Sequence, residues 1–181
     1  MSEWETMARA LMAERHPRLL ARARMLVPSL AEAEDLVQDA LIATFSKRRG
    51  FASLAQAEQY VRRAIVTTHL NAAKRGARER QRWASVGSAD VVPDHAAEVA
   101  GEADVAGILH GLAPRVRACI VLRYLEDLSI ADTARVLGLS DGAVKRYVSD
   151  GLRELNGRLG TQATVADVVV ARVDVRPGGV A

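Results

Sequence analysis

The chain has 181 residues, room for one large domain or two small ones, and carries 25 Lys and Arg against 22 Asp and Glu. Only two Phe, two Trp and three Tyr are present, so the cores must be mainly Ala, Leu and Val, which favours an all-α fold. The single cysteine, Cys119, excludes an internal disulfide. No apolar run approaches the ~20 residues that span a bilayer, and the acidic, polar start is unlike a signal peptide. We therefore expect a cytoplasmic protein without a membrane segment.

Charge is unevenly distributed along the chain. Residues 1–82 carry 15 Lys and Arg against 9 Asp and Glu, residues 83–114 carry none against 5, and residues 115–159 carry 8 against 6. Two basic blocks on either side of an acidic stretch indicate two nucleic-acid-facing modules on an anionic connector.

The first module is predicted to be helical. Its first segment forms one helix or two short ones and is interrupted by Pro28. A second helix begins at Ser29 or the following residues, and its acidic first turn suits the positive end of a helix dipole. Ser53 is expected to cap a third helix from about Leu54 to Lys74, in which apolar residues repeat with helical spacing.

The end of the third helix is densely cationic. Five basic side chains fall within nine residues: Lys74, Arg75, Arg78, Arg80 and Arg82. Glu79 alone offsets them. Such a run usually marks a solvated helix end, but clustered cations are also what phosphate neutralisation requires. Both interpretations stay open at this level.

Helical periodicity is lost over residues 84–103, where Gly, Ser, Pro and acidic residues predict a flexible linker. A short helix then precedes Pro114, which suits the first turn of a further helix because a missing N–H costs nothing there. The last stretch, 161–181, alternates Val with other residues and has strand propensity. No function is predicted for this tail.

Residues 128–159 are predicted to form two helices joined by a tight turn. Ser129 caps the first, Gly138 ends it in a left-handed conformation, and Ser140 caps the second. The second helix has an apolar stripe with helical spacing: Val144, Val148, Leu152, Leu155 and Leu159. Its opposite face carries Lys145, Arg146, Ser149 and Arg153. This pattern is typical of a helix-turn-helix that presents a recognition helix to a DNA groove; an ordinary helical hairpin with a solvated basic face is the alternative.

No catalytic or metal-binding constellation is apparent. The four histidines, His16, His69, His95 and His110, are scattered over unrelated segments, and no phosphate-cradling glycine loop is present. We therefore predict that the protein is not an enzyme and has neither cofactor nor metal site.

Two segments together resemble one family. Residues 33–45, AEDLVQDALIATF, resemble the region 2 helix of bacterial sigma factors of the extracytoplasmic-function (ECF) type, and residues 128–155, LSIADTARVLGLSDGAVKRYVSDGLREL, resemble their region 4. The order of the parts fits, and the resemblance covers about residues 8–159. The Ala-, Arg- and Val-rich composition is consistent with an actinobacterial-like member.

The resemblance implies a subunit that binds core RNA polymerase and directs promoter-specific transcription initiation. It implies a region 2-like helical bundle at 1–83, the linker at 84–103, a region 4-like helix-turn-helix domain at 104–160 and the tail at 161–181. The partners would be promoter DNA and core RNA polymerase, through the clamp helices of its large subunit and its flap. Members are often held inactive by an anti-sigma factor, and no residue here identifies one.

The resemblance also implies site residues. The polymerase-binding positions are Asp35, Gln38 and Asp39. The −10 element would be melted and recognised by base stacking and phosphate contacts, through Lys47, Arg48, Arg49, Tyr60, Arg63, Asn71, Lys74, Arg75 and Arg78. The −35 major groove would receive the helix beginning at Asp141, with candidates Ser140, Asp141, Lys145, Arg146, Tyr147, Ser149 and Arg153.

Several positions depart from the family pattern. Tyr60 replaces a frequent Trp, Thr67 a frequent Asn and Asn71 a frequent Asp, while Tyr147 and Asp150 stand where basic residues are common. An anion facing DNA is normally repulsive, although Asp can accept a hydrogen bond from a cytosine amino group. These departures bear on the promoter sequence, which the chain itself does not reveal.

Two other functions fit the same pattern. A stand-alone helix-turn-helix regulator would bury the Asp35–Asp39 face in a dimer and bind only duplex DNA. A helical adaptor would bind protein through its N-terminal half, and it would tolerate charge reversal at Lys74, Arg75 and Arg78.

Overall fold

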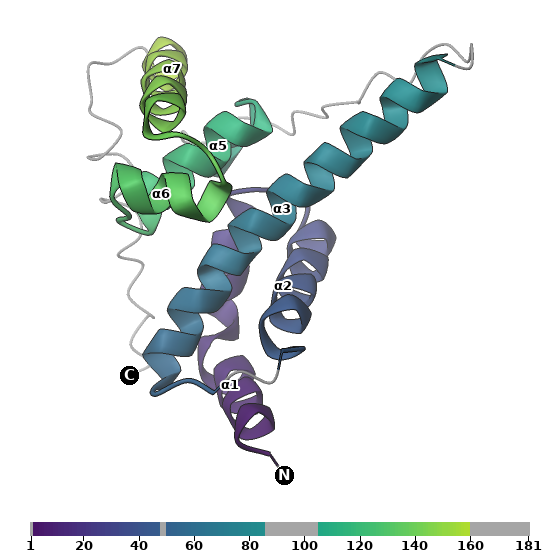
Figure 1. Cartoon of the computed structure of the whole chain (residues 1–181), viewed down its shortest axis with the longest axis vertical. Helices are drawn as coiled ribbons and strands as arrows, with labels where there is room; N and C mark the ends of the chain where they lie inside the picture. Colours follow the sequence, from purple (N-terminus) through teal and green to yellow (C-terminus); the bar gives the residue numbers. More distant parts are fainter. Residues whose placement is uncertain (1, 48–49, 86–104, 160–181) are drawn as a thin grey trace, which may run out of the picture. The chain divides into compact units, whose positions relative to one another are not determined.

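The structure, a computed structural model, describes residues 2–47, 50–85 and 105–159. Over these ranges the regular secondary structure consists of helices, and no strand is present. The chain divides into two compact units, residues 1–110 and residues 111–181 (Figure 1). The predicted all-α, two-domain architecture is confirmed. Residues 86–104, which include most of the predicted linker at 84–103, and the tail from residue 160 lie outside the described residues.

The first unit is built on three helices, α1 (Glu3–Arg24), α2 (Leu30–Phe45) and α3 (Leu54–Ser85), each of which packs on the other two. α1 is one helix that continues through Pro17. The core between the helices is aliphatic, with fully buried Leu11, Leu19, Leu26, Val37, Val61, Ile65 and Val66. The short helix α4 (Val105–His110) belongs to the same unit, and Nε2 of His110 lies 2.8 Å from the carbonyl oxygen of Arg24.

The start of α2 is fixed by a capping box. The backbone N–H of Glu32 donates to Oγ of Ser29 at 3.1 Å, and the Glu32 carboxylate accepts from the Ser29 backbone N–H at 3.3 Å. The predicted start of the second helix is therefore confirmed. Because the cap sets the first residue of the helix, it also sets which α2 side chains face the core and which face solvent.

A buried carboxylate ties α1 to α3. Glu58 of α3 is only 6% exposed, and its Oε2 lies 3.5 Å from Nε of Arg15 in α1. The Arg62 guanidinium donates to the other oxygen, Oε1. A carboxylate buried at this depth is tolerated because it is paired and hydrogen-bonded. The sequence pattern gave no indication of this triad.

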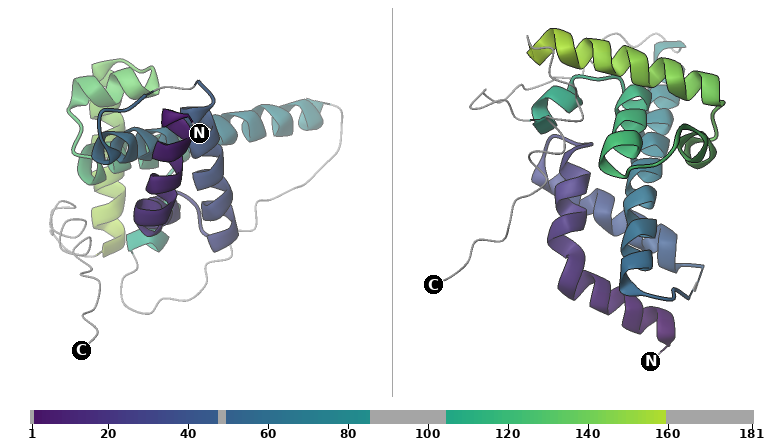
Figure 2. Two further views of the ribbon diagram at one scale, coloured as in Figure 1. Left: turned by 90° about the horizontal axis from the view of Figure 1, so that it is seen from below. Right: turned by 90° about the vertical axis from the view of Figure 1, so that its left-hand side faces the viewer.

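α3 is longer than predicted. It ends at Ser85, not near Lys74, so the predicted end was wrong. The added turns are rich in Ala, Arg, Gln and Glu, which are strong helix formers, and they carry the helix past Gly76. The buried residues of α3 end at Leu70, so its last turns extend beyond α1 and α2 (Figures 1 and 2).

The second unit contains α5 (Pro114–Ile120), a π-helical segment η1 (Val121–Leu125), α6 (Ile130–Leu137) and α7 (Asp141–Leu159). α7 packs on both α5 and α6. Pro114 takes the first position of α5, as predicted. The π-helical turn was not predicted, because no residue pattern distinguishes it from an α-helix; in it the backbone N–H of Glu126 bonds to the carbonyl of Val121 at 3.1 Å.

The predicted helix-turn-helix is confirmed in its local geometry. Oγ of Ser129 accepts from the backbone N–H of Asp132 at 3.0 Å, which caps α6. Gly138 ends α6 with φ +63°, in the left-handed region that glycine adopts without strain. Oγ of Ser140 accepts from the backbone N–H of Ala143 at 3.2 Å, which caps α7. Among the described helices, none has the length and apolar character that crossing a membrane requires.

Candidate nucleic-acid interface

α7 buries its apolar side in the second unit and exposes its cationic side to solvent. Val144, Val148 and Leu155 are buried against the rest of the unit. At 100° per residue the predicted polar residues fall within an arc of about 100° on the other side of the helix. All four are exposed: Lys145, Arg146, Ser149 and Arg153. The predicted stripe is confirmed at these three residues, whereas Leu152 is only half-buried, and the face that the stripe leaves open is the basic one.

Two of the predicted −35 residues stabilise the start of α7. The Ser140 hydroxyl is the N-cap, and Asp141 occupies the first turn, where a carboxylate is favoured by the helix dipole. Further along, the carboxylate of Asp150 lies 3.3 Å from Nη1 of Arg153, and both side chains are largely exposed. An exposed pair of this kind contributes little to stability, so Arg153 can exchange this partner for another anion.

Tyr147 lies at the centre of a small cationic cluster that the sequence did not reveal. The guanidinium groups of Arg115 and Arg146, Arg115 first, lower the pKa of Tyr147 below its ordinary value, because they favour the charged form of its hydroxyl. The Arg146 guanidinium carbon also lies 5.2 Å from the centre of the Tyr147 ring. Arg115 comes from the first turn of α5, and no local pattern could have placed it beside the recognition helix. Two cations held side by side suit a phosphate.

The α3 residues implied in −10 recognition share one helix face. Tyr60, Arg63, Asn71, Lys74, Arg75 and Arg78 fall within an arc of about 120° at 100° per residue. The buried residues Val61, Ile65 and Glu58 lie on the other side, toward α1 and α2. Tyr60, Asn71, Arg75 and Arg78 are exposed, whereas Arg63 and Lys74 are half-buried. Residues scattered over nineteen positions of sequence are therefore brought into one row.

An aromatic stack fixes the Tyr60 ring. The centre of the Phe51 ring lies 5.6 Å from that of Phe45 and 5.6 Å from that of Tyr60, in edge-on and tilted arrangements. Phe45 and Phe51 are buried, while Tyr60 keeps 42% of its surface exposed. The Tyr60 ring is exposed and rests on buried aromatic side chains, so an unpaired nucleobase can stack on it. In the loop that follows α2, Lys47 is exposed; Arg48 and Arg49 lie outside the described residues.

The predicted polymerase-binding residues also lie on one exposed face. Asp35, Gln38 and Asp39 are exposed on the side of α2 opposite its buried Leu36, Val37 and Ala40. The same face continues into Ile42, which is 59% exposed. Ile42 borders an apolar hollow between α1 and α2, also lined by Trp4, Ala8, Leu41, Phe45 and Ser46.

Cys119 is fully buried in α5, and burial raises the pKa of its thiol to about 11. A thiol buried in this way is structural, because the reactive thiolate is disfavoured there. No cluster of three or more His, Cys, Asp or Glu side chains arranged to hold a metal ion occurs among the residues that the structure describes.

Comparison with known proteins matches both modules. The family model for sigma-70 region 2 matches residues 11–82, and that for sigma-70 region 4 matches residues 103–155. An RNA polymerase sigma-E factor of Streptomyces avermitilis is 34% identical over 145 residues, which cover 80% of each chain. The sigma-E factor of Streptomyces coelicolor is 33% identical over 155 residues, 80% of this chain and 81% of that one.

Two further matches are more distant. The ECF sigma factor SigM of Mycobacterium tuberculosis is 31% identical over 132 residues, 72% of this chain and 66% of its own. The sigma factor RpoE of Bartonella quintana, solved in complex with the anti-sigma factor NepR, superimposes with a TM-score of 0.60. That match covers 86% of this chain and 98% of RpoE at 23% identity, and it supports the fold alone.

An all-α protein with a region 2 bundle and a region 4 helix-turn-helix is a sigma factor of the sigma-70 class. The chain belongs to the ECF group of that family, together with its actinobacterial relatives. It is accordingly a subunit that binds core RNA polymerase and promoter DNA and directs transcription initiation.

Proposed function

We propose that three helix faces each bind a different partner during initiation. The Asp35–Asp39 face of α2 docks on the clamp helices of the polymerase large subunit. The Tyr60 face of α3 binds the −10 element, and the Lys145 face of α7 enters the major groove of the −35 element. The observation that carries this proposal is that each set of residues lies on the side of its helix opposite the buried core. Each is therefore rigidly positioned and still accessible.

The −10 face suits melted DNA. Unpaired bases gain stability by stacking on aromatic rings, and Tyr60 supplies a ring whose orientation Phe51 fixes. Lys74, Arg75 and Lys47 supply the charge that neutralises phosphates. Melting then follows from differential binding, because these groups bind the separated strand better than the paired one.

The −35 face suits duplex DNA. Lys145 and Arg146 project from the first half of α7, the part of a recognition helix that reaches base edges. Arg115 and Tyr147 lie beside them, and we propose that the guanidinium groups of Arg115 and Arg146 hold a backbone phosphate next to the groove. Asp141 and Asp150 flank this face, and Asp150 favours a cytosine on the strand that it meets.

The domain limits proposed for these activities are residues 1–83 and 104–160, with the −10 and polymerase faces in the first and the −35 face in the second; α4, which opens the second range, packs with the first unit in the structure. The chain itself catalyses no reaction and acts in the cytoplasm, where its polymerase is. Because the Bartonella relative RpoE is bound by its anti-sigma factor NepR, we also propose an anti-sigma partner for this chain.

Footprinting of promoter complexes tests this division. Core polymerase with this protein should protect duplex DNA at −35 and make thymines near −10 reactive to permanganate, because those bases are unpaired. Polymerase without the protein should do neither on the same DNA. Protection by the protein alone, with no permanganate-reactive bases when polymerase is added, would instead support a stand-alone duplex-binding regulator.

A further inference from the structure

A buried ion pair lies within the apolar contact between α1 and α3. Arg15 falls midway between Leu11 and Leu19 on the buried side of α1. Glu58 lies one turn before Val61 on the buried side of α3. Its Oε2 atom is 3.5 Å from Nε of Arg15, and we call this contact the Arg15–Glu58 bridge. The bridge therefore stands where the pattern of both helices would place an apolar contact.

The two partners of Glu58 differ in what they join. Arg62 also donates to the Glu58 carboxylate, but it lies one turn along the same helix. Its bond stabilises the buried charge, yet it cannot hold α3 against α1. Arg15 belongs to α1, so its contact with Glu58 bears on how α3 is rotated against α1. The side chains of Arg15 and Glu58 are 29% and 8% exposed, so solvent screens this pair less than a surface pair.

An ion pair at this place contributes direction more than stability. Removing two charges from water costs free energy that their attraction only partly returns, so apolar side chains of similar size are often at least as stabilising. Aliphatic side chains, however, pack in several neighbouring arrangements of similar free energy. A carboxylate and a guanidinium meet in far fewer geometries. The Arg15–Glu58 bridge therefore favours one rotation of α3 over its neighbours.

The opposite face of α3 depends on that rotation. Tyr60 and Arg63 lie about 160° and about 140° around the helix from Glu58. Because side chains stand about 5–6 Å from the helix axis, a rotation of about 20° would move each of them by about 2 Å. The Tyr60 ring would then shift against the Phe51 ring, whose centre is 5.6 Å from its own. A shift of this size is enough to misplace a stacked base.

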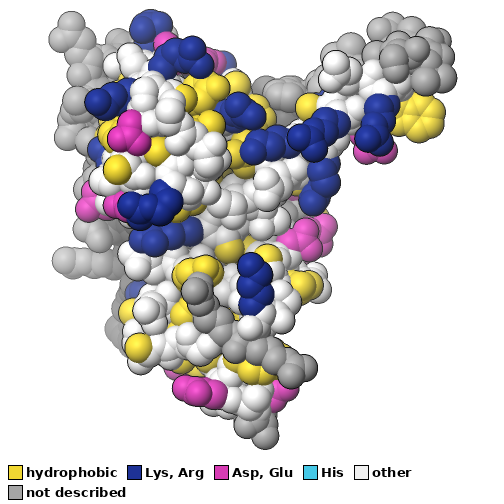
Figure 3. Space-filling view, in the orientation of Figure 1, with side chains coloured by type: hydrophobic (Ala, Val, Ile, Leu, Met, Phe, Trp, Pro, Cys, Tyr) yellow, Lys and Arg dark blue, Asp and Glu magenta, His cyan; other side chains and the backbone are white. Residues whose placement is uncertain are grey.

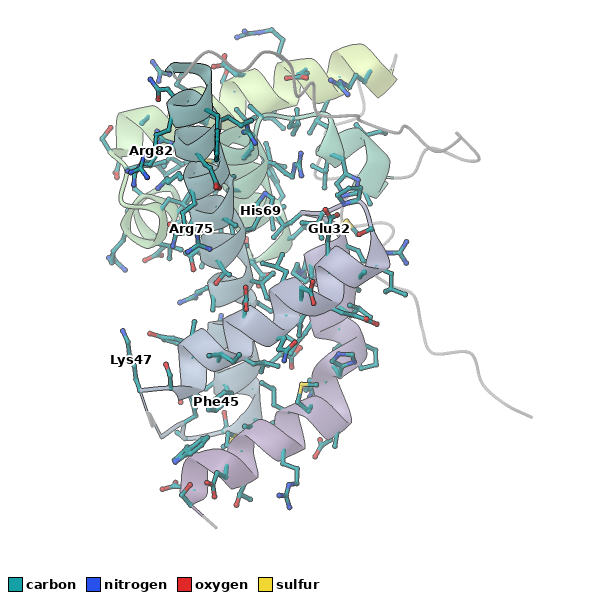
Figure 4. The ribbon with its side chains drawn as sticks, turned by 90° about the vertical axis from the view of Figure 1, so that its right-hand side faces the viewer. Glu32, Phe45, Lys47, His69, Arg75 and Arg82 are labelled. Carbon is teal, nitrogen blue, oxygen red and sulfur yellow. The ribbon has the colours of Figure 1, made fainter. Side chains whose placement is uncertain are left out.

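The rotation of α3 is set in its first half. Leu70 is the last buried residue of this helix. In Figure 3, dark blue side chains follow the later turns on the surface of the protein. In Figure 4, Arg75 and Arg82 lie along these later turns, whereas Phe45, which supports the aromatic stack, lies near the start of α3. The contacts that fix the helix are therefore those of the part that contains Glu58.

We propose that the Arg15–Glu58 bridge is a positioning pair for −10 recognition. It holds α3 in the rotation that keeps the Tyr60 ring on Phe51 and presents Arg63 on the same face. Arg15 and Glu58 act through α3 and do not themselves contact DNA. This inference rests on the proposed −10 role of the Tyr60 face and adds the interaction that orients it.

Arg15 and Arg62 provide matched variants for a test. Arg15→Met and Arg62→Met each remove one guanidinium from Glu58 and leave the other, but only the first breaks the link between the helices. Arg15→Lys keeps a cation that can reach the carboxylate. Each full-length variant is assembled with core polymerase. Its affinity for a single-stranded oligonucleotide that carries the −10 sequence, as mapped by run-off transcription, is measured by fluorescence anisotropy.

A triple variant separates positioning from stability. Arg15→Met, Glu58→Met and Arg62→Met together replace the three charges by apolar side chains of similar length. In urea titration this variant should be at least as stable as the wild type, because no buried charge is left without a partner. It should also comigrate with core polymerase, because the Asp35–Asp39 face of α2 is unchanged. Arg15→Met and the triple variant should bind the −10 strand about tenfold or more weakly, while Arg62→Met and Arg15→Lys bind it like the wild type.

Wild-type affinity of the triple variant for the −10 strand would overturn the inference, and so would equal losses in Arg15→Met and Arg62→Met. A triple variant that is less stable than the wild type would also overturn it, because the bridge would then serve the stability of the fold. In each of these cases, binding by the wild-type holoenzyme still upholds the proposed function. A wild-type holoenzyme that does not bind the −10 strand would overturn both.

Discussion

Gly151 of α7 lies directly against Val116 of α5: a Cβ placed on Gly151 would come within 2.7 Å of Cγ1 of Val116 and 3.0 Å of Cγ1 of Ile120. No real Cβ tolerates the shorter distance, so α7 can approach α5 this closely only because residue 151 has no side chain. This contact sets the position of the recognition helix on the unit that carries it.

Gly151→Ala should therefore destabilise the second unit by about 1–3 kcal/mol, the usual cost of overpacking a core. Gly157→Ala is the matched control, because the same helix offers open space there; it should be neutral or stabilising by up to about 1 kcal/mol. Urea titration with pulsed labelling of the buried Cys119 thiol reports unfolding of this unit specifically. Equal stability of the two variants would show that α5 and α7 do not pack as described.

Lys145→Glu and Arg146→Glu should each weaken binding to −35 duplex DNA sharply, since an attraction to phosphate or to a base edge becomes a repulsion. Arg146→Glu should have the larger effect because it also disrupts the cluster around Tyr147. Footprinting of the −35 region by the reconstituted holoenzyme measures this. Unchanged protection in both variants would place the recognition surface elsewhere.

Asp35→Arg should impair assembly with core polymerase while leaving duplex binding by the helix-turn-helix intact, because the two surfaces lie in different units. Glu14→Arg makes the same charge change on an exposed position of α1 and serves as control. Size-exclusion comigration with core polymerase gives the readout. If Glu14→Arg reduced comigration as much as Asp35→Arg, the effect would be one of net charge and not of the α2 face.

The Cys119 thiol should make stability depend on pH in the alkaline range. Burial raises its pKa from 9.0 to about 11, so the unfolded chain loses the proton first. Its contribution to stability is therefore complete below pH 9 and is lost as pH rises toward 11. The loss of unfolding free energy between about pH 8 and about pH 10.5 should be smaller in Cys119→Ala. An identical loss in both proteins would mean that the thiol is not buried in the folded state.

Local signals predicted much of this fold. Ser29, Ser129, Gly138 and Ser140 each act through hydrogen bonds or backbone geometry within a few residues, so their caps and turns could be predicted from the sequence. The end of α3 was mispredicted because its charged residues suit a helix and a solvated tail equally well; only the length of the formed helix distinguishes them.

Local spacing also predicted part of the candidate site. Helical spacing was enough to place Lys145, Arg146, Ser149 and Arg153 on one face. The contacts of Arg115 with Tyr147 and of Glu58 with Arg15 join helices that are distant in sequence. Contacts of this kind depend on how helices pack, and a single sequence carries no periodic signal for them.

Run-off transcription with purified core polymerase tests the central claim most directly. Sheared genomic DNA from the source organism serves as template, and 5′ ends are mapped with and without this protein. We predict new discrete 5′ ends that share a pair of upstream elements and that disappear with Asp35→Arg. The absence of new 5′ ends, together with no comigration of the protein with core polymerase, would contradict a sigma factor function.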